Sequence, residues 1–93
     1  MLKQQDIRAL HLIEGSKERF ERHRRWLVEA YGPEDAELNF KAFLKLFRDS
    51  DPDGARRIAS KIRSRELRAD VETAIDYYRP CLLPPPESPF SSL

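Results

Sequence analysis

The pattern of hydrophobic positions is clearest between residues 36 and 47, where apolar side chains recur at helical spacing. The stripe consists of Ala36, Phe40, Phe43, Leu44 and Phe47. Apolar residues at i, i+4, i+7, i+8 and i+11 lie along one side of a helix. Because three of the five phenylalanines of the chain belong to this stripe, we expect the helix to be central to the core, with Phe43 in the middle of its buried face.

The first third of the chain has a second helical pattern, from residue 3 to residue 31. Its predicted buried face consists of Ile7, Leu10, Ile13, Phe20, Leu27 and Tyr31. Because Ile13, Phe20 and Leu27 are spaced by seven, we expect one near-continuous rod. A bend or short break is expected at Gly15, where Ser16 can cap a new helix.

Gly32 and Pro33 separate this rod from the Phe-rich helix. Glycine suits the residue after a helix, and proline suits the first turn of the next one. Glu34 and Asp35 follow, as is favoured near the positive end of a helix. The Phe-rich helix is therefore predicted from about residue 33 to Arg48.

Two more helices are predicted beyond residue 50. Asp51 followed by Pro52 is typical of an N-cap and a first helical residue. One apolar set then follows at Ala55, Ile58, Ala59 and Ile62, and a second at Leu67, Val71, Ala74, Ile75 and Tyr78. On one continuous helix the two sets would point about 180° apart, so we expect a break near Ser64 and Arg65, with helices at about 52–63 and 66–79. The alternative is one long helix between two partners, which would imply a dimer.

Proline dominates the C-terminal segment. Residues 80–93 contain five of the seven prolines, including Pro84, Pro85 and Pro86. Pro80 is expected to end the last helix. Polyproline II or disorder is expected beyond it, and the apolar residues able to pack in a groove are Leu82, Leu83 and Phe90. The predicted fold is all-α: a small bundle of four or five helices over residues 1–79, with an extended Pro-rich tail over residues 80–93.

Composition narrows the classes of function. Charged residues make up 35% of the 93 residues, against about 25% in a typical protein. The net charge is only +1, which argues against a general polyanion binder. Cys81 is the only cysteine, so no intramolecular disulfide can form, and a reducing, cytoplasmic location is expected. No apolar run is long enough for a secretory signal or a membrane span.

The acidic residues around position 51 resemble the start of a calcium loop. Asp49, Asp51, Asp53 and Gly54 stand at the first, third, fifth and sixth positions of such a loop. The twelfth position should be a glutamate that binds calcium through both oxygens, and here it is Ser60. An acidic turn that caps a helix explains these residues better than a calcium site does.

The two histidines and the cysteine do not form a recognisable site. Glu14 follows His11 by three residues and Glu21 precedes His23 by two, an order that differs from the Glu-x-x-His pairs of di-iron bundles. Cys81 has no histidine close in sequence that could activate it. The chain also lacks a Gly-rich phosphate-binding loop. No metal, cofactor or enzymatic activity is therefore expected.

Two groups of basic residues are the remaining candidates. The first basic cluster consists of Lys17, Arg19, Arg22, Arg24 and Arg25, and the second of Arg56, Arg57, Lys61, Arg63, Arg65 and Arg68. Glu18 and Glu21 stand four residues before arginines of the first cluster, so pairing along the helix is expected to make it a solvated face. The second cluster has only Glu66 among its residues. Its members Arg57, Lys61 and Arg65 recur every four residues, which predicts an exposed basic stripe.

These observations predict a small, non-enzymatic regulatory or adaptor protein that binds another protein with an acidic surface. Trp26 lies beside the predicted buried face, and tryptophan and arginine are enriched at interface hot spots. The predicted partner-binding residues are Arg57, Lys61, Arg65 and Arg68, together with Trp26, Arg24 and Arg25. The alternative is a helical nucleic-acid-binding module that uses the second basic cluster, although the helices after Asp51 lack the turn glycine of a helix-turn-helix. A homodimer stays open as a further alternative.

Overall fold

The computed structural model of the chain describes residues 2–82 and folds them into five helices without a strand. The helices are α1 (Gln4–Glu14), α2 (Lys17–Tyr31), α3 (Pro33–Phe47), α4 (Pro52–Ala59) and α5 (Arg65–Leu82). The predicted all-α fold is confirmed for this part of the chain. The predictions for the tail beyond residue 82 lie outside the described residues.

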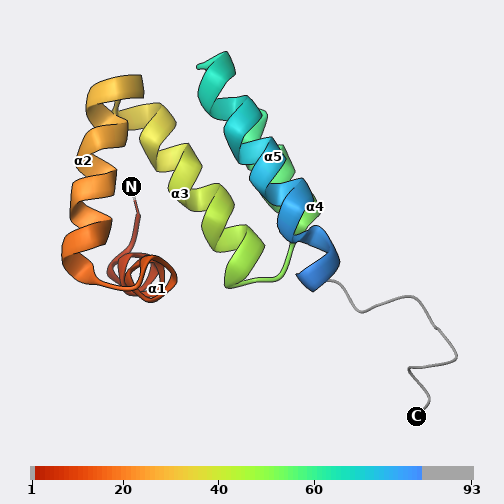
Figure 1. Cartoon of the computed structure of the whole chain (residues 1–93), viewed down its shortest axis with the longest axis horizontal. Coiled ribbons are helices and arrows are strands. Elements are labelled where there is room, and N and C mark those ends of the chain that lie inside the picture. The colour runs from red at the N-terminus through yellow and green to blue at the C-terminus, as the bar shows by residue number, and fades with distance from the viewer. Residues whose placement is uncertain (1, 83–93) are drawn as a thin grey trace, which may run out of the picture.

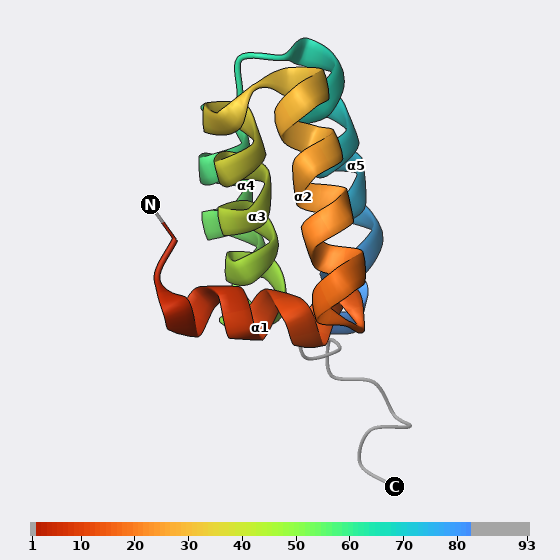
Figure 2. The ribbon, with the colours of Figure 1, turned by 90° about the vertical axis from the view of Figure 1, so that its left-hand side faces the viewer.

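The central helix is α3, which packs against each of the other four helices. In Figure 1, α2 lies on one side of α3, and α4 and α5 lie together on the other side. Figure 2 shows α1 crossing one end of the bundle, below α2 and α3. The predicted central place of the Phe-rich helix is therefore confirmed.

The predicted break at Gly15, with Ser16 as the cap of a new helix, is confirmed. The predicted near-continuity of the rod over residues 3–31 is wrong, because α1 and α2 are separate helices that meet at a sharp corner (Figure 2). Gly15 ends α1 in the left-handed region, with φ of +91°, a conformation that reverses the chain direction and favours glycine. Ser16 then caps α2 by accepting a hydrogen bond from the Arg19 amide at 3.2 Å. The guanidinium of Arg48, at the end of α3, pairs with Asp6 and so ties α1 across the end of the bundle.

The turn between α4 and α5 begins earlier than predicted, because α4 ends at Ala59 rather than near residue 63. The buried carboxylate of Asp35, in the first turn of α3, accepts hydrogen bonds from the backbone amides of Arg63 and Ser64, each at 3.0 Å. The Ser64 hydroxyl in turn accepts a hydrogen bond from the Leu67 amide at 3.2 Å and caps α5. The predicted break near Ser64 is confirmed, and the alternative of one long helix is wrong.

The other end of α5 also differs from the prediction. The helix continues through Pro80 to Leu82 instead of ending before the proline. Pro80 has no amide hydrogen to donate to the carbonyl of residue 76. Only two residues of helix follow the proline, so the missing hydrogen bond destabilises only the last turn of α5.

The core is built around α3, which is buried on two opposite flanks. On one flank Phe40 packs against Phe20 of α2, with ring centroids 5.0 Å apart. Ala42 and Leu46 are fully buried on the opposite flank. Phe43 lies between the two flanks and is only partly buried, so its predicted place at the middle of the buried face is wrong. The buried apolar residues are Leu10, Phe20, Leu27, Ala36, Phe40, Ala42, Leu44, Leu46, Ala55, Ala59, Ile62, Leu67, Val71 and Ile75.

Candidate protein-binding groove

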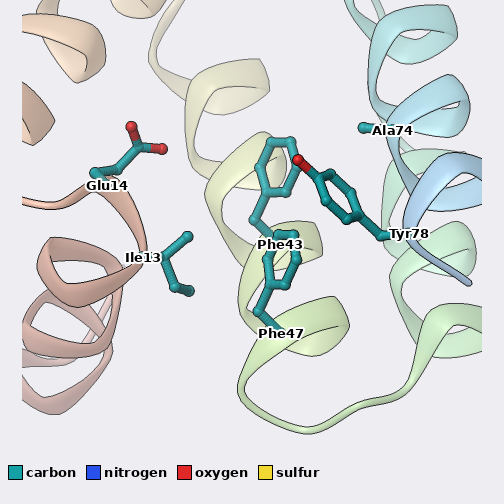
Figure 3. A pocket seen from close by; sticks show the side chains of 6 residues that line it. All are labelled: Ile13, Glu14, Phe43, Phe47, Ala74 and Tyr78. Atoms are coloured by element: carbon teal, nitrogen blue, oxygen red, sulfur yellow. The ribbon is translucent and has the colours of Figure 1, made fainter. Parts of the chain in front are cut away.

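An open hollow of about 570 Å³ lies where α3 is left uncovered between the α1–α2 corner and α5. Figure 3 shows the side chains of Phe43 and Phe47 reaching from α3 toward Tyr78 of α5, which points back toward them. Ile13 of α1 points in from the other side (Figure 3). The residues that line the hollow are Ile13, Glu14, Phe43, Phe47, Ala74 and Tyr78.

A second hollow, of about 180 Å³, continues toward the other end of the bundle. It shares Phe43 with the first hollow, and α2 contributes Trp26 to its wall while α5 contributes Asp70. The two hollows meet at Phe43, and we refer to them together as the groove, which lies along α3 between α2 and α5. Its further lining residues are His23, Leu27, Tyr31, Asn39, Leu67 and Val71.

Aromatic rings cover much of the groove. Phe43 and Phe47 stack with centroids 6.1 Å apart, and Phe47 meets Tyr78 edge to face at 5.0 Å. Tyr77 packs edge to face on Tyr78, which lines the groove, and is itself 74% exposed. At the opposite side Trp26 is 55% exposed. Large contiguous apolar surfaces that remain exposed mark binding sites on small proteins.

The two rims of the groove carry opposite charge. Arg19 and Arg22 precede Trp26 by seven and four residues, so they lie on the same side of α2. Both are exposed, and neither has an ion-pair partner among the residues that the structure describes. On the α5 side, Glu66 and Asp70 face the end of α2.

The pKa of the Tyr31 phenol reflects the negative charge of the α5 rim. Burial raises the pKa of the Tyr31 phenol, and the charges of Glu66 and Asp70 raise it further. The interaction of the phenol with the Glu66 carboxylate also favours the protonated form and so raises the pKa. Arg19 and Arg22 thus make the α2 rim basic beside Trp26, although Glu14 also lines the groove at the α1 corner, and Glu66 and Asp70 make the α5 rim acidic.

The residues of the first basic cluster do not share one surface. Arg24 lines a separate hollow of about 370 Å³ between α1 and α2, together with Lys17 and Glu21. Trp26 lies two residues further along, on a different side of the helix and beside the groove. Arg25 is exposed and lies between these two sides. The predicted pairs Glu18–Arg22 and Glu21–Arg25 are not formed in the described structure.

The second basic cluster is divided by its ion pairs. Arg56 binds Asp76 at 2.7 Å and Glu72 at 3.3 Å. Arg68 lies 3.9 Å from Glu72 and donates a hydrogen bond to the Ile62 carbonyl at 3.2 Å. These two arginines therefore tie α4 and the α4–α5 turn to α5 and are not available as predicted.

Arg57, Lys61 and Arg65 are the exposed part of the second basic cluster. All three side chains are exposed, as predicted. They also have no ion-pair partner within residues 2–82. The three residues could stack along one side only if the helix reached residue 65, and they do not, because α4 ends at Ala59. Lys61 lies in the turn and Arg65 begins α5.

The acidic residues that resemble a calcium loop cap a helix or pair with arginines. Asp51 caps α4 by accepting a hydrogen bond from the Gly54 amide at 2.9 Å. Asp49 accepts a hydrogen bond from Arg48 at 2.9 Å, which lowers the pKa of its carboxyl group. Asp53 pairs with Arg79 of α5. No group of three histidine, cysteine, aspartate or glutamate side chains suited to a metal ion occurs in the described residues.

The groove itself was not predicted from the sequence. Helical periodicity assigned Phe43, Phe47 and Tyr78 to buried faces, because it shows which residues share a side but not which neighbour covers them. One signal was present: the adjacent apolar pairs Leu12–Ile13 and Tyr77–Tyr78 are too wide to be buried together by one helix face. The structure leaves Leu12 and Tyr77 largely exposed.

Comparisons of the chain with models of known protein families, with curated proteins and with solved structures give no match. Among the described residues, no helix combines the length and the apolar character that crossing a membrane requires.

Proposed function

We propose that this chain is a small, non-enzymatic protein-binding module, and that its groove takes an amphipathic helix of a partner protein. The observation that carries the proposal is the aromatic floor of the groove, which stays open between α2 and α5. These two helices each pack on α3 but not extensively on one another. A partner helix laid between them would cover Phe43, Phe47 and Tyr78 and extend the bundle by one element. Helix-in-groove binding of this kind uses apolar anchors at i, i+3, i+4 and i+7.

The charges of the two rims specify the orientation of the partner helix. Acidic residues on one edge of its apolar stripe would meet Arg19 and Arg22 of α2. Basic residues on the other edge would meet Glu66 and Asp70 of α5. Complementary charge of this kind sets the association rate and the specificity more than the affinity, while Trp26 and the groove aromatics supply the buried anchors.

This proposal moves the binding surface away from Arg57, Lys61, Arg65 and Arg68, the sequence-predicted residues. A cytoplasmic location is part of the proposal, because Cys81 is an exposed free thiol, and such thiols persist in reducing compartments. The function remains that of a regulatory or adaptor protein.

Nucleic-acid binding is the second candidate, and the unpaired state of Arg57, Lys61 and Arg65 favours it. Three cations at one end of the molecule would contact few phosphates, since Arg56 and Arg68 are held by acids of α5. The expected signature is a steep fall of affinity for duplex DNA or RNA with rising salt. Loss of that binding in the double variant Arg57→Glu, Lys61→Glu would support this candidate.

The test of the groove is a selection of peptides from a random 16-residue library against the whole chain. We expect the selected peptides to carry apolar residues at helical spacing, with acids on one edge and bases on the other. Ala74→Arg places a long cation in the groove and should weaken their binding by about tenfold or more, as should Ile13→Arg. Ala69→Arg is the matched control, because Ala69 is exposed on α5 but does not line the groove.

Thermal melting of each variant shows that it remains folded before its affinity is compared. Peptides that bind the Ala74→Arg and Ile13→Arg variants as well as the wild type would exclude the groove as the binding site.

A further inference from the structure

We propose that residues 83–93 of this chain occupy the groove and compete with the partner helix. This inference rests on the proposed function of the groove and names its regulation. The segment reads Leu83, three consecutive prolines, Glu87, Ser88, Pro89, Phe90, two serines and Leu93. It follows directly on α5, the helix that forms one wall of the groove.

The segment starts close to the groove. Tyr78 lines the groove and lies four residues before Leu82, the last residue of α5. Four residues of helix advance the chain by about 6 Å. Leu82, the last described residue, therefore lies at the Phe47 end of the groove.

The segment is also long enough to follow the groove to its other end. The floor of the groove is part of α3, whose 15 residues span about 22 Å. In a polyproline II conformation, the seven steps from residue 83 to Phe90 cover about the same distance, ~22 Å at 3.1 Å per residue. Because α5 runs in the same direction as α3 (Figure 1), a segment docked in the groove has to turn back after Leu82. It then brings Phe90 toward Trp26 while the three prolines pass Phe47 and Phe43.

The chemistry of the segment matches the floor and one rim. Proline-rich chains in polyproline II conformation dock on grooves lined by aromatic rings, and they lose little conformational entropy on binding. Phe43, Phe47 and Tyr78 form such a surface here. Glu87, the only charged side chain of the segment, falls midway along it, where the basic α2 rim with Arg19 and Arg22 is within reach.

Tethering makes weak docking sufficient for regulation. A segment joined by a short linker has an effective concentration in the millimolar range. A segment that binds with a Kd of about 1 mM or less would then occupy the groove in a large share of the molecules. The apparent Kd of the partner helix rises in proportion, because only the unoccupied share can bind it.

Paramagnetic relaxation enhancement in the full-length chain tests this inference. A nitroxide is attached to Ser92→Cys in a Cys81→Ser background, and backbone amide signals are compared with the reduced, diamagnetic form. We expect strong attenuation at groove residues such as Phe43 and Ala74, and weak attenuation at Arg57 on α4. The preference should disappear when Pro84, Pro85 and Pro86 are changed to glycine together with Phe90→Ala. The matched control, Ser88→Ala with Ser91→Ala, should keep it.

Three outcomes would overturn the inference. Equal attenuation at Ala74 and Arg57 would mean that the segment does not dock. Attenuation that persists in the glycine variant would mean that the prolines and Phe90 do not carry it. A mixture of isotope-labelled chain without nitroxide and unlabelled chain with nitroxide detects docking between molecules. Attenuation of equal size in that mixture would assign the groove to the segment of a second copy.

The same variants separate this inference from the proposed function. If the segment docks, the glycine variant should bind the selected helical peptides at least about twofold more tightly than the wild type, because a segment with a Kd of about 1 mM leaves about half of the molecules open. Peptide binding that depends on Ala74 without any docking of residues 83–93 would refute the inference alone. Docking of the segment without any peptide binding at the groove would refute the proposed partner helix alone.

Discussion

The carboxylate of Asp35 accepts a hydrogen bond from the backbone amide of Ser64, at 3.0 Å and across 29 positions of sequence. Its other oxygen accepts a hydrogen bond from the neighbouring amide of Arg63, also at 3.0 Å. One side chain of α3, only 6% exposed, therefore fixes the turn that leads into α5. This turn precedes α5, which forms a wall of the groove.

Replacing Asp35 by alanine should lower the free energy of unfolding by about 2–4 kcal/mol, because two backbone amides lose a charged acceptor in a partly buried site. Glu34→Ala is the control next to it. Glu34 makes only an exposed ion pair with Arg63 at 3.7 Å, so its loss should cost less than about 1 kcal/mol. Urea unfolding followed by circular dichroism measures both, and equal losses for the two variants would contradict the role assigned to Asp35.

Phe40 and Phe43 should differ in their effect on stability although both belong to the same apolar stripe. Phe40 is 1% exposed, so Phe40→Ala should cost about 3–5 kcal/mol. Phe43 is partly exposed in the groove, and Phe43→Ala should cost about 1–3 kcal/mol and leave the chain folded. Denaturant unfolding compares the two; a Phe43→Ala chain less stable than Phe40→Ala would place Phe43 in the core, as its spacing alone suggests.

These two phenylalanines also show how far the sequence predicts the fold. The spacing of the stripe correctly identified a central helix, because period 3.6 reports which residues share a side. It could not show that α3 is buried on two flanks by different neighbours. Buried residues on the second flank include Asn39 and Asp35, polar residues that hydropathy assigns to the surface.

The groove depends on how far apart the helices stand, which the periodicity of the sequence does not specify. Gly15 marked the break between the first two helices, but the direction of α1 relative to the bundle is set by tertiary contacts such as the Arg48–Asp6 pair. The groove exists because α2 and α5 stand apart on either side of α3. Trp26 was identified as a candidate anchor from its position beside the buried face, and its place at the groove could not be inferred without α5.

Gly15 should be needed for the corner between α1 and α2. Its φ of +91° is unfavourable for a residue with a Cβ atom, although no other atom would clash with that Cβ. Gly15→Ala should therefore cost about 1–2 kcal/mol through the backbone alone. Gly15→Asn should cost less, because asparagine tolerates positive φ better than alanine. Thermal melting of the two variants checks this order, and a more stable alanine variant would contradict the left-handed corner.

The Tyr31 phenol should titrate at higher pH than an unperturbed tyrosine, since its pKa is raised by burial and by the charges of Glu66 and Asp70. Ultraviolet absorbance at alkaline pH measures this, and Tyr31→Phe should remove the most alkaline step. Glu66→Gln should lower the pKa of Tyr31, because the variant removes one of the two negative charges. A titration curve unchanged by Glu66→Gln would contradict the assigned contact.

The sign of the pH dependence follows from the raised pKa. Below the unfolded-state pKa of about 10, Tyr31 is protonated in both states and its contribution to stability is constant. Above that pH the unfolded chain ionises first, so the folded state loses stability as the pH rises through the raised pKa. The alkaline loss of stability should be smaller in Tyr31→Phe than in the wild type.

Photo-crosslinking in the native host tests the binding groove most directly. A benzophenone amino acid replaces Tyr77, which packs on Tyr78 of the groove, in one chain and Arg57 in the second basic cluster in another. The proposed function predicts protein adducts from position 77 that disappear when Ala74→Arg is added and persist with Ala69→Arg. Adducts from position 57 alone, or adducts to nucleic acid, would contradict the groove as the functional surface.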